Sequence, residues 1–150
     1  MSLRDAFPSG MREDARKRLL PAGTVLRVRT QFEDNTAKEK RIIVAHVDET
    51  TSACLINTSD GHFQVMQPEL LICQATMLQG EHPFMDHDSH VDCSRLRPYP
   101  TDWLLEQIEL TPSRRLGVIS PALRVAMLSA LKHAPHISVI EMNRVLASFQ

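Results

Sequence analysis

The feature that most constrains the fold is the segment 38–60, which reads as two β-strands joined by a short polar turn. Residues 42–47 and 53–57 are apolar runs, and the residues between them are polar. Such a pair of runs is typical of a β-hairpin. In an antiparallel hairpin the first strand begins beside the point where the second strand ends. The hairpin therefore predicts which polar side chains meet at its open end.

The open end of this hairpin carries side chains that suit a phosphodiester group. Basic residues precede the first strand, and small polar residues close the second. They are Lys38, Lys40 and Arg41, followed by Asn57, Thr58 and Ser59. We expect Arg41 to approach Thr58 and Ser59, which places a planar cation beside hydroxyl donors. The alternative interpretation is a charged strand edge followed by an ordinary turn.

Further short strands are predicted on both sides of the hairpin. Residues 24–32 alternate well enough for a half-buried strand, and 62–66 and 91–96 also have strand patterns. Residues 69–78 are apolar enough to be either a strand or a buried helical turn. Prolines and glycines separate these segments, which indicates several short strands rather than a few long ones.

The last third of the chain changes to helical patterns. Ser120 and Pro121 predict a helix start, because serine caps a helix and proline suits its first position. Ser138 and Glu141 form a capping box, which predicts the start of a final helix. Strands first and helices last indicate the α+β class. We expect a small antiparallel barrel with C-terminal helices packed on one side.

Length and composition predict one domain. We expect it to span residues 23–150, after an N-terminal arm or short helix at residues 1–22. The three cysteines include no CxxC pair, which argues against a disulfide framework or a zinc cluster. No apolar run is long enough to cross a membrane. We therefore expect a cytoplasmic protein that has no membrane partner and no bound cofactor.

Charge limits how this chain could bind a nucleic acid. The formal net charge of -1 gives no global attraction to RNA, so any contact must come from a local patch. The residues that could form such a patch lie on the predicted strands and beside the hairpin. We take these candidate substrate-binding residues to be Arg27, Arg29, Lys38, Lys40 and Asn57.

A segment rich in histidine and aspartate precedes the predicted strand at 91–96. It contains His82, Asp86, His87, Asp88, His90 and Asp92. Five of these residues have the chemistry of a metal site, which is one interpretation: His82, His87, Asp88, His90 and Asp92. The other is that His87 or His90 supplies the near-neutral acid or base that an arginine cannot supply.

The order of these segments resembles the PemK/MazF toxin family. The stretches GTVLRVRT, KRIIVAHV, ACLINTSD, VDCSRLR and LGVISPALRVAMLSALK carry the resemblance, which covers residues 23–132. It implies a small SH3-like barrel with a C-terminal helix, usually dimeric. It also implies a sequence-selective endoribonuclease that an antitoxin peptide holds in check. The family's catalytic arginine and phosphate-holding threonine would match Arg41 and Thr58, with Ser59 adjacent.

The resulting hypothesis is a metal-independent, toxin-type endoribonuclease that cleaves single-stranded RNA by attack of the 2'-hydroxyl group. Its candidate catalytic residues are Arg41, Thr58, Ser59, His87 and His90. Its expected partners are RNA, an antitoxin protein and a second copy of the chain. Two alternatives remain. One is a binding module of the same fold without catalysis, and the other is a metal-dependent phosphoesterase that uses the histidine- and aspartate-rich segment.

Overall fold

The computed structural model describes residues 9–57 and 68–149 of the chain. The predicted strand at 62–66 lies outside these residues. So do Thr58 and Ser59, two of the candidate catalytic residues. The predictions for these positions therefore stay predictions.

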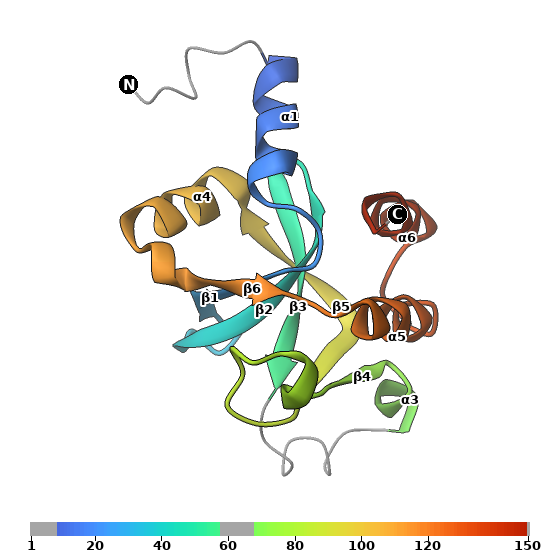
Figure 1. The fold of residues 1–150 in the computed structure, drawn as a ribbon. Coiled ribbons are helices and arrows are strands. Elements are labelled where there is room, and N and C mark those ends of the chain that lie inside the picture. The colour runs from blue at the N-terminus through green and yellow to red at the C-terminus, as the bar shows by residue number, and fades with distance from the viewer. Residues whose placement is uncertain (1–8, 58–67, 150) are drawn as a thin grey trace.

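The described residues form an antiparallel sheet of six strands with helices around it, which confirms the α+β class (Figure 1). In spatial order the strands run β4-β5-β3-β2-β1-β6. Their bounds are β1 (Thr24–Gln31), β2 (Ala37–Val47), β3 (Thr50–Asn57), β4 (Gln74–Met77), β5 (Ser89–Pro100) and β6 (Arg115–Val118). The predicted hairpin is confirmed as β2 and β3. However, β2 begins at Ala37, because β1 continues to pair with it there, so the basic cluster lies inside the strand.

The last two helices begin where the sequence patterns predict, after Ser120 and Ser138. The helical segments are α1 (Ser9–Leu19), α3 (Pro68–Leu71), α4 (Thr101–Leu110), α5 (Pro121–Leu131) and α6 (Val139–Ser148), with single turns η2 (Gln79–Glu81) and η3 (Pro112–Arg114). The Ser120 and Ser138 hydroxyls accept hydrogen bonds from the backbone N–H groups of Leu123 and Glu141, both at 3.1 Å. The ambiguous segment 69–78 divides into α3 and β4.

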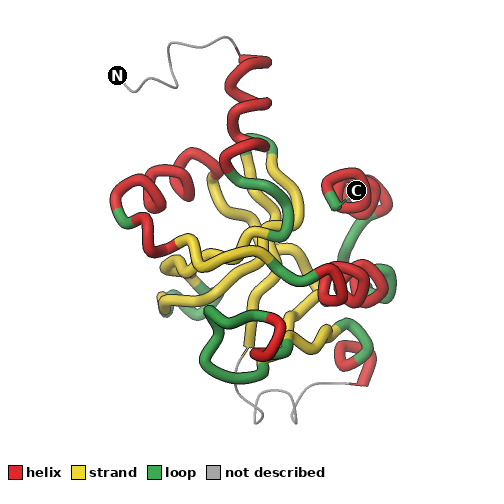
Figure 2. Tube along the Cα trace, viewed as in Figure 1, coloured by secondary structure: helices red, strands yellow, loops and turns green. Residues whose placement is uncertain are grey.

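Two apolar cores lie on opposite faces of the sheet, because successive side chains of a strand point to opposite sides. The inner face carries Leu26, Val28, Ile42, Val44, Ala53, Leu55 and Tyr99, and α4 adds Leu104 and Leu105. The outer face carries Val25, Ile43, Cys54, Ile56, Val91 and Cys93, and α5 and α6 cover it. Helices therefore lie on both faces and not on one side only, which corrects that expectation (Figure 2).

The sheet coils strongly without closing into a barrel. Its edge strands are β4 and β6, and in the described residues no ladder joins them. Register shifts in the β2–β3 and β3–β5 ladders increase the local bend. As a result, the end of β1 reaches β5 across the inner face. The hydroxyl groups of Thr30 and Tyr99 lie 2.9 Å apart, and the Arg97 guanidinium carbon lies 5.2 Å from the centre of the Phe32 ring.

Candidate functional site

A pocket of about 310 Å³ lies where the outer face of β1 and β2 continues beyond the core. Its walls are Arg27, Glu39, Lys40, Arg41, Ile56, Asp86 and His87. Arg27 and Arg41 are direct partners in the β1–β2 ladder, so two guanidinium groups start from neighbouring positions on one face. Four residues that the sequence marked as candidates, Arg27, Lys40, Arg41 and His87, thus meet at one pocket.

Strand alternation explains why Arg41 lies at the border between core and solvent. It follows the same face of β2 as Ile43, which is fully buried, but two positions closer to the open end. The Arg41 side chain is 22% exposed. Its Nη2 donates to Asp86 Oδ2 at 3.1 Å, and its Nη1 lies 3.7 Å from the Met85 sulfur. The guanidinium is therefore held in place by residues of the loop between η2 and β5.

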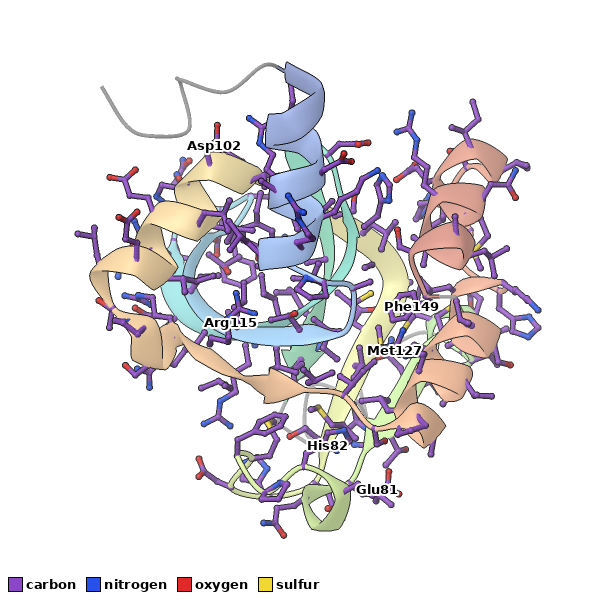
Figure 3. All side chains as sticks on the ribbon, turned by 45° about the horizontal axis from the view of Figure 1, so that its top comes forward. Glu81, His82, Asp102, Arg115, Met127 and Phe149 are labelled. Atoms are coloured by element: carbon purple, nitrogen blue, oxygen red, sulfur yellow. The ribbon has the colours of Figure 1, made fainter. Side chains whose placement is uncertain are left out.

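Buried His82 fixes this loop against the start of α5 (Figure 3). Its Nε2 accepts the backbone N–H of Ser120 at 2.9 Å, so the ring proton is on Nδ1, which donates to the Leu78 carbonyl oxygen at 2.8 Å. Phe84 packs over Gly117 of β6, where a Cβ atom would lie 2.5 Å from the ring. These two attachments place Asp86 and His87 beside Arg41.

One carboxylate of the pocket is already engaged by a cation that the sequence did not reveal. Glu39 accepts hydrogen bonds from both terminal nitrogens of Arg114, at 3.0 and 3.2 Å. The same arginine donates to the Arg27 carbonyl oxygen at 2.9 Å. The hydrogen bond from Arg114 holds the pKa of Glu39 below its ordinary value, and the charges of Arg114, Arg27 and Arg29 add to this effect. Arg27, Lys40 and Arg41 are therefore opposed within the pocket mainly by Asp86.

The structure divides the remaining candidates between the two faces. Arg29 lies on the outer face, opposite Glu39 in the ladder. Lys38, Lys40 and Asn57 start from the inner face, where the Lys40 amine donates to the Asn57 amide oxygen at 3.3 Å. His90 pairs with Asn57 and Thr76 in the sheet and also belongs to the inner face. The structure therefore does not bring His90 to Arg41.

The histidine- and aspartate-rich segment does not converge on one point. Both ring nitrogens of His82 have backbone partners, and Asp88 accepts the backbone N–H of Gln79 at 2.8 Å. Asp92 accepts from Gln74 Nε2 at 3.0 Å. Among the residues that the structure describes, no group of three or more His, Cys, Asp or Glu side chains could hold a metal ion.

The sequence patterns missed Glu39 as a pocket residue and Arg114 as the partner of Glu39. Arg114 lies 75 positions after Glu39. No periodicity and no motif connects the two residues, so nothing in the sequence indicated that they pair. Asp86 did carry a signal, since it belongs to the histidine- and aspartate-rich segment. What the segment could not show is that Asp86 pairs with Arg41 instead of with its neighbouring histidines.

A second set of polar contacts joins α6 to the end of β2. His46 Nδ1 lies 2.9 Å from Ser148 Oγ, and its Nε2 lies 2.9 Å from Asp48 Oδ2. The Ser148 hydroxyl donates to the Arg144 carbonyl oxygen at 2.9 Å, so its proton is not directed at the histidine. These residues resemble a nucleophile relay in composition, but the geometry is that of a clamp between helix and sheet.

Comparisons with known proteins do not identify the chain. No family model matches it, and no curated protein matches it. Across residues 9–57 and 68–149, no helix combines the length and the apolar character that crossing a membrane requires. The fold and the pocket define the class of the molecule: it is an α+β protein with a basic pocket at one end of a coiled sheet.

Proposed function

We propose that this chain is a metal-independent endoribonuclease of the PemK/MazF type, in which the coiled sheet corresponds to the SH3-like barrel. The observation that carries the proposal is the meeting of Arg27, Arg41 and His87 at one pocket. Two guanidinium groups can bind the phosphate of single-stranded RNA, and an imidazole can move protons near neutral pH.

The proposed reaction needs orientation, charge stabilisation and proton transfer. Arg41 would bind the non-bridging oxygens of the scissile phosphate and stabilise the charge that develops on them. His87 Nδ1 lies 3.0 Å from the Asp88 carbonyl oxygen, which suits a protonated Nδ1 and leaves Nε2 as the basic nitrogen. Nε2 would take the proton of the 2'-hydroxyl as that oxygen attacks phosphorus. The P–O5' bond breaks, and the 5'-oxygen takes a proton from a solvent water, whose hydroxide is neutralised by the proton held on His87. A cyclic phosphate and a 5'-hydroxyl remain.

The proposal extends to partners and location. A second copy of the chain, an antitoxin protein that blocks the pocket, and the cytoplasm as compartment all follow from the family resemblance. The Arg41–Asp86 ion pair supports blockage of this kind, because a carboxylate already occupies the guanidinium that would bind phosphate. An acidic segment of a partner could compete for the same group.

The same ion pair favours a second candidate function, a binding module that holds RNA without cleaving it. In such a module Asp86 would limit the affinity of Arg41 for phosphate, and His87 would be a surface side chain without a catalytic role. This candidate predicts RNA binding without new RNA ends.

The test is incubation of purified protein with single-stranded RNA in the presence of a chelator, followed by mapping of the ends. The enzyme hypothesis predicts cyclic phosphate and 5'-hydroxyl ends. It also predicts a loss of roughly 100-fold or more in cleavage rate for Arg41→Ala and for His87→Ala. Lys132→Ala, a change at an exposed position after α5, is the matched control. Equal cleavage by Arg41→Ala and wild type would reject the enzyme hypothesis, and binding without cleavage would favour the module.

A further inference from the structure

We infer that the inner face carries a second phosphate subsite, formed by Lys38, Lys40 and Arg97, which holds the RNA strand beyond the pocket. We call these three residues the inner-face basic cluster. The inference rests on the proposed function for the identity of the ligand, but the chemistry it names, a phosphate group, can be tested alone.

The coiling of the sheet brings the cluster together. Lys38 and Lys40 project from the inner face of β2, and Arg97 projects from the inner face of β5, which is two strands away in the sheet. Arg97 reaches back over Phe32 at the end of β1, with 5.2 Å between the guanidinium carbon and the ring centre. The coiling thereby brings cations from β2 and β5, which are not adjacent strands, to the same inner face.

The charges of this cluster are only partly balanced by the acids around it. Glu33 and Asp92 act on Arg97, and Asp34 acts on Lys38. The Lys40 amine is half-buried, and burial lowers its pKa, as do the charges of Lys38 and Arg97. The nearby carboxylates have other donors. Glu33 pairs with Arg95 at 2.9 Å, and Asp34 accepts from the Thr36 hydroxyl at 2.6 Å. An anion placed between Lys40 and Arg97 would relieve their mutual repulsion.

Arg97 also has an unused hydrogen-bond donor. Its Nε is buried and has no partner among the described residues. A buried donor without a partner costs free energy, so a ligand oxygen at this position would be stabilising. Burial is the main cause that lowers the pKa of Arg97, and the charge of Arg95 adds to it, whereas Tyr99, Glu33 and Asp92 act in the opposite direction. Arginine nevertheless stays charged at neutral pH, so the group remains a phosphate donor.

Lys40 connects the cluster with the pocket. It lines the pocket beside Arg41, and its amine reaches the inner face to donate to Asn57. A single strand that leaves the pocket at Arg41 can therefore pass Lys40 at the end of the β2–β3 ladder and meet Arg97 with its next phosphates. Cationic tracks of this kind are typical of sites that follow a nucleic-acid backbone without reading bases.

The first experiment measures binding of fluorescent single-stranded RNA of about 4 and about 12 nucleotides over a range of salt concentrations. Catalysis is blocked with His87→Ala in every sample. Lys38→Gln and Arg97→Gln are expected to weaken binding of the longer RNA by about 3- to 10-fold and to reduce the salt slope by about 1. Binding of the shorter RNA should stay within about 2-fold, because it occupies only the pocket. Lys132→Gln is the control, and thermal unfolding of each variant verifies folding.

The second experiment separates this inference from the proposed function. Inorganic phosphate is titrated into wild type and Arg97→Gln, while the side-chain NMR signals of Lys40 and Arg97 are followed. Shifts in wild type that Arg97→Gln abolishes support the subsite even if no RNA binds, in which case free phosphate or a nucleotide is the ligand. Absence of phosphate shifts, or equal long-RNA affinity of Arg97→Gln and Lys132→Gln, overturns the inference. If Arg41→Ala loses RNA binding but still shows the phosphate shifts at Lys40 and Arg97, the subsite is supported separately from the pocket.

Discussion

The guanidinium group of Arg41 lies 3.1 Å from the Asp86 carboxylate, which comes 45 positions later in the chain. The two groups meet because the loop that carries Asp86 is attached to the start of α5 and to β6. The contact pairs Arg41, the cation best placed to bind phosphate, with Asp86, the carboxylate that would repel a phosphate bound there. Asp86 is 78% exposed, so the pair has a larger effect on the charge of the pocket than on folding.

We predict that Asp86→Asn tightens RNA binding by about 2- to 5-fold, because it removes a negative charge beside the phosphate site. The free energy of unfolding should change by less than about 0.5 kcal/mol. Binding is measured by fluorescence anisotropy and stability by urea unfolding. Glu106→Gln, at an exposed position on α4, is the control for a general charge effect. Weaker binding by Asp86→Asn would mean that Asp86 orients Arg41 instead of competing for it.

Gly117 allows the pocket loop to pack closely on β6. A Cβ atom at this position would lie 2.5 Å from Phe84 Cε1, whereas at Gly80 nothing lies within 4 Å. We predict that Gly117→Ala displaces the half-buried Phe84 ring and lowers the free energy of unfolding by about 1–3 kcal/mol. It should also reduce RNA binding, although Gly117 does not line the pocket, because Phe84 lies on the loop that carries Asp86 and His87. Gly80→Ala is the matched control and should be nearly neutral.

A double mutant tests the cause of this effect. Phe84→Leu shortens the side chain that the new methyl group would meet, so Gly117→Ala should cost less in that background. Urea unfolding and RNA binding are measured for both single variants and the pair. Strictly additive losses would show that the glycine matters for a reason other than Phe84.

The local features of the fold could be predicted from the sequence because they depend on neighbouring residues. Two apolar runs around a polar turn were enough for the β2–β3 hairpin, and Ser120 and Ser138 marked the starts of α5 and α6. The strand pattern predicted at residues 91–96 is confirmed within β5 (Ser89–Pro100). Each of these predictions needs only the geometry of one element.

The features that could not be predicted depend on long-range register. Alternation shows that His90 and Asp92 share a face, but not which face the pocket occupies. That depends on how β5 pairs with β3. The contact of Thr30 with Tyr99 depends on coiling that register shifts help to produce. The pairing of Glu39 with Arg114 requires β6 to return beside β1, for which no local pattern gives a signal.

Among the histidines that the structure describes, His82 is predicted to contribute most to stability. It is fully buried, and its loss would leave the Leu78 carbonyl and the Ser120 N–H without partners. We expect His82→Ala to lower the free energy of unfolding by about 2–4 kcal/mol, from unpaired groups and a cavity together. His136→Ala, at an exposed position, should be within about 0.5 kcal/mol of wild type.

Urea unfolding at neutral pH measures both variants, and the wild type is repeated with a chelator. The chelator should leave the unfolding midpoint unchanged, because both ring nitrogens of His82 are used by the backbone. A midpoint that falls on chelation would instead support metal binding by the histidine- and aspartate-rich segment.

Tyr99 reports on the coiling of the sheet because it is the one tyrosine of the chain. Burial raises its pKa above the ordinary value of 10.0, although the hydrogen bond with Thr30 and the charge of Arg97 act in the opposite direction. The folded state therefore disfavours the phenolate. Its contribution to stability is complete below the pKa of unfolded tyrosine and is lost as the pH rises through the folded value.

We predict that tyrosinate absorbance in the native protein titrates at a higher pH than in denaturant. Thr30→Val should raise the midpoint further, because the hydrogen bond that favours the phenolate is removed. The same variant should cost about 1 kcal/mol in urea unfolding at neutral pH. Thr36→Val, in the loop between β1 and β2, is the control and should leave the tyrosine midpoint unchanged. A native midpoint equal to that of the unfolded chain would mean that Tyr99 is exposed and that the coil does not bring β1 to β5.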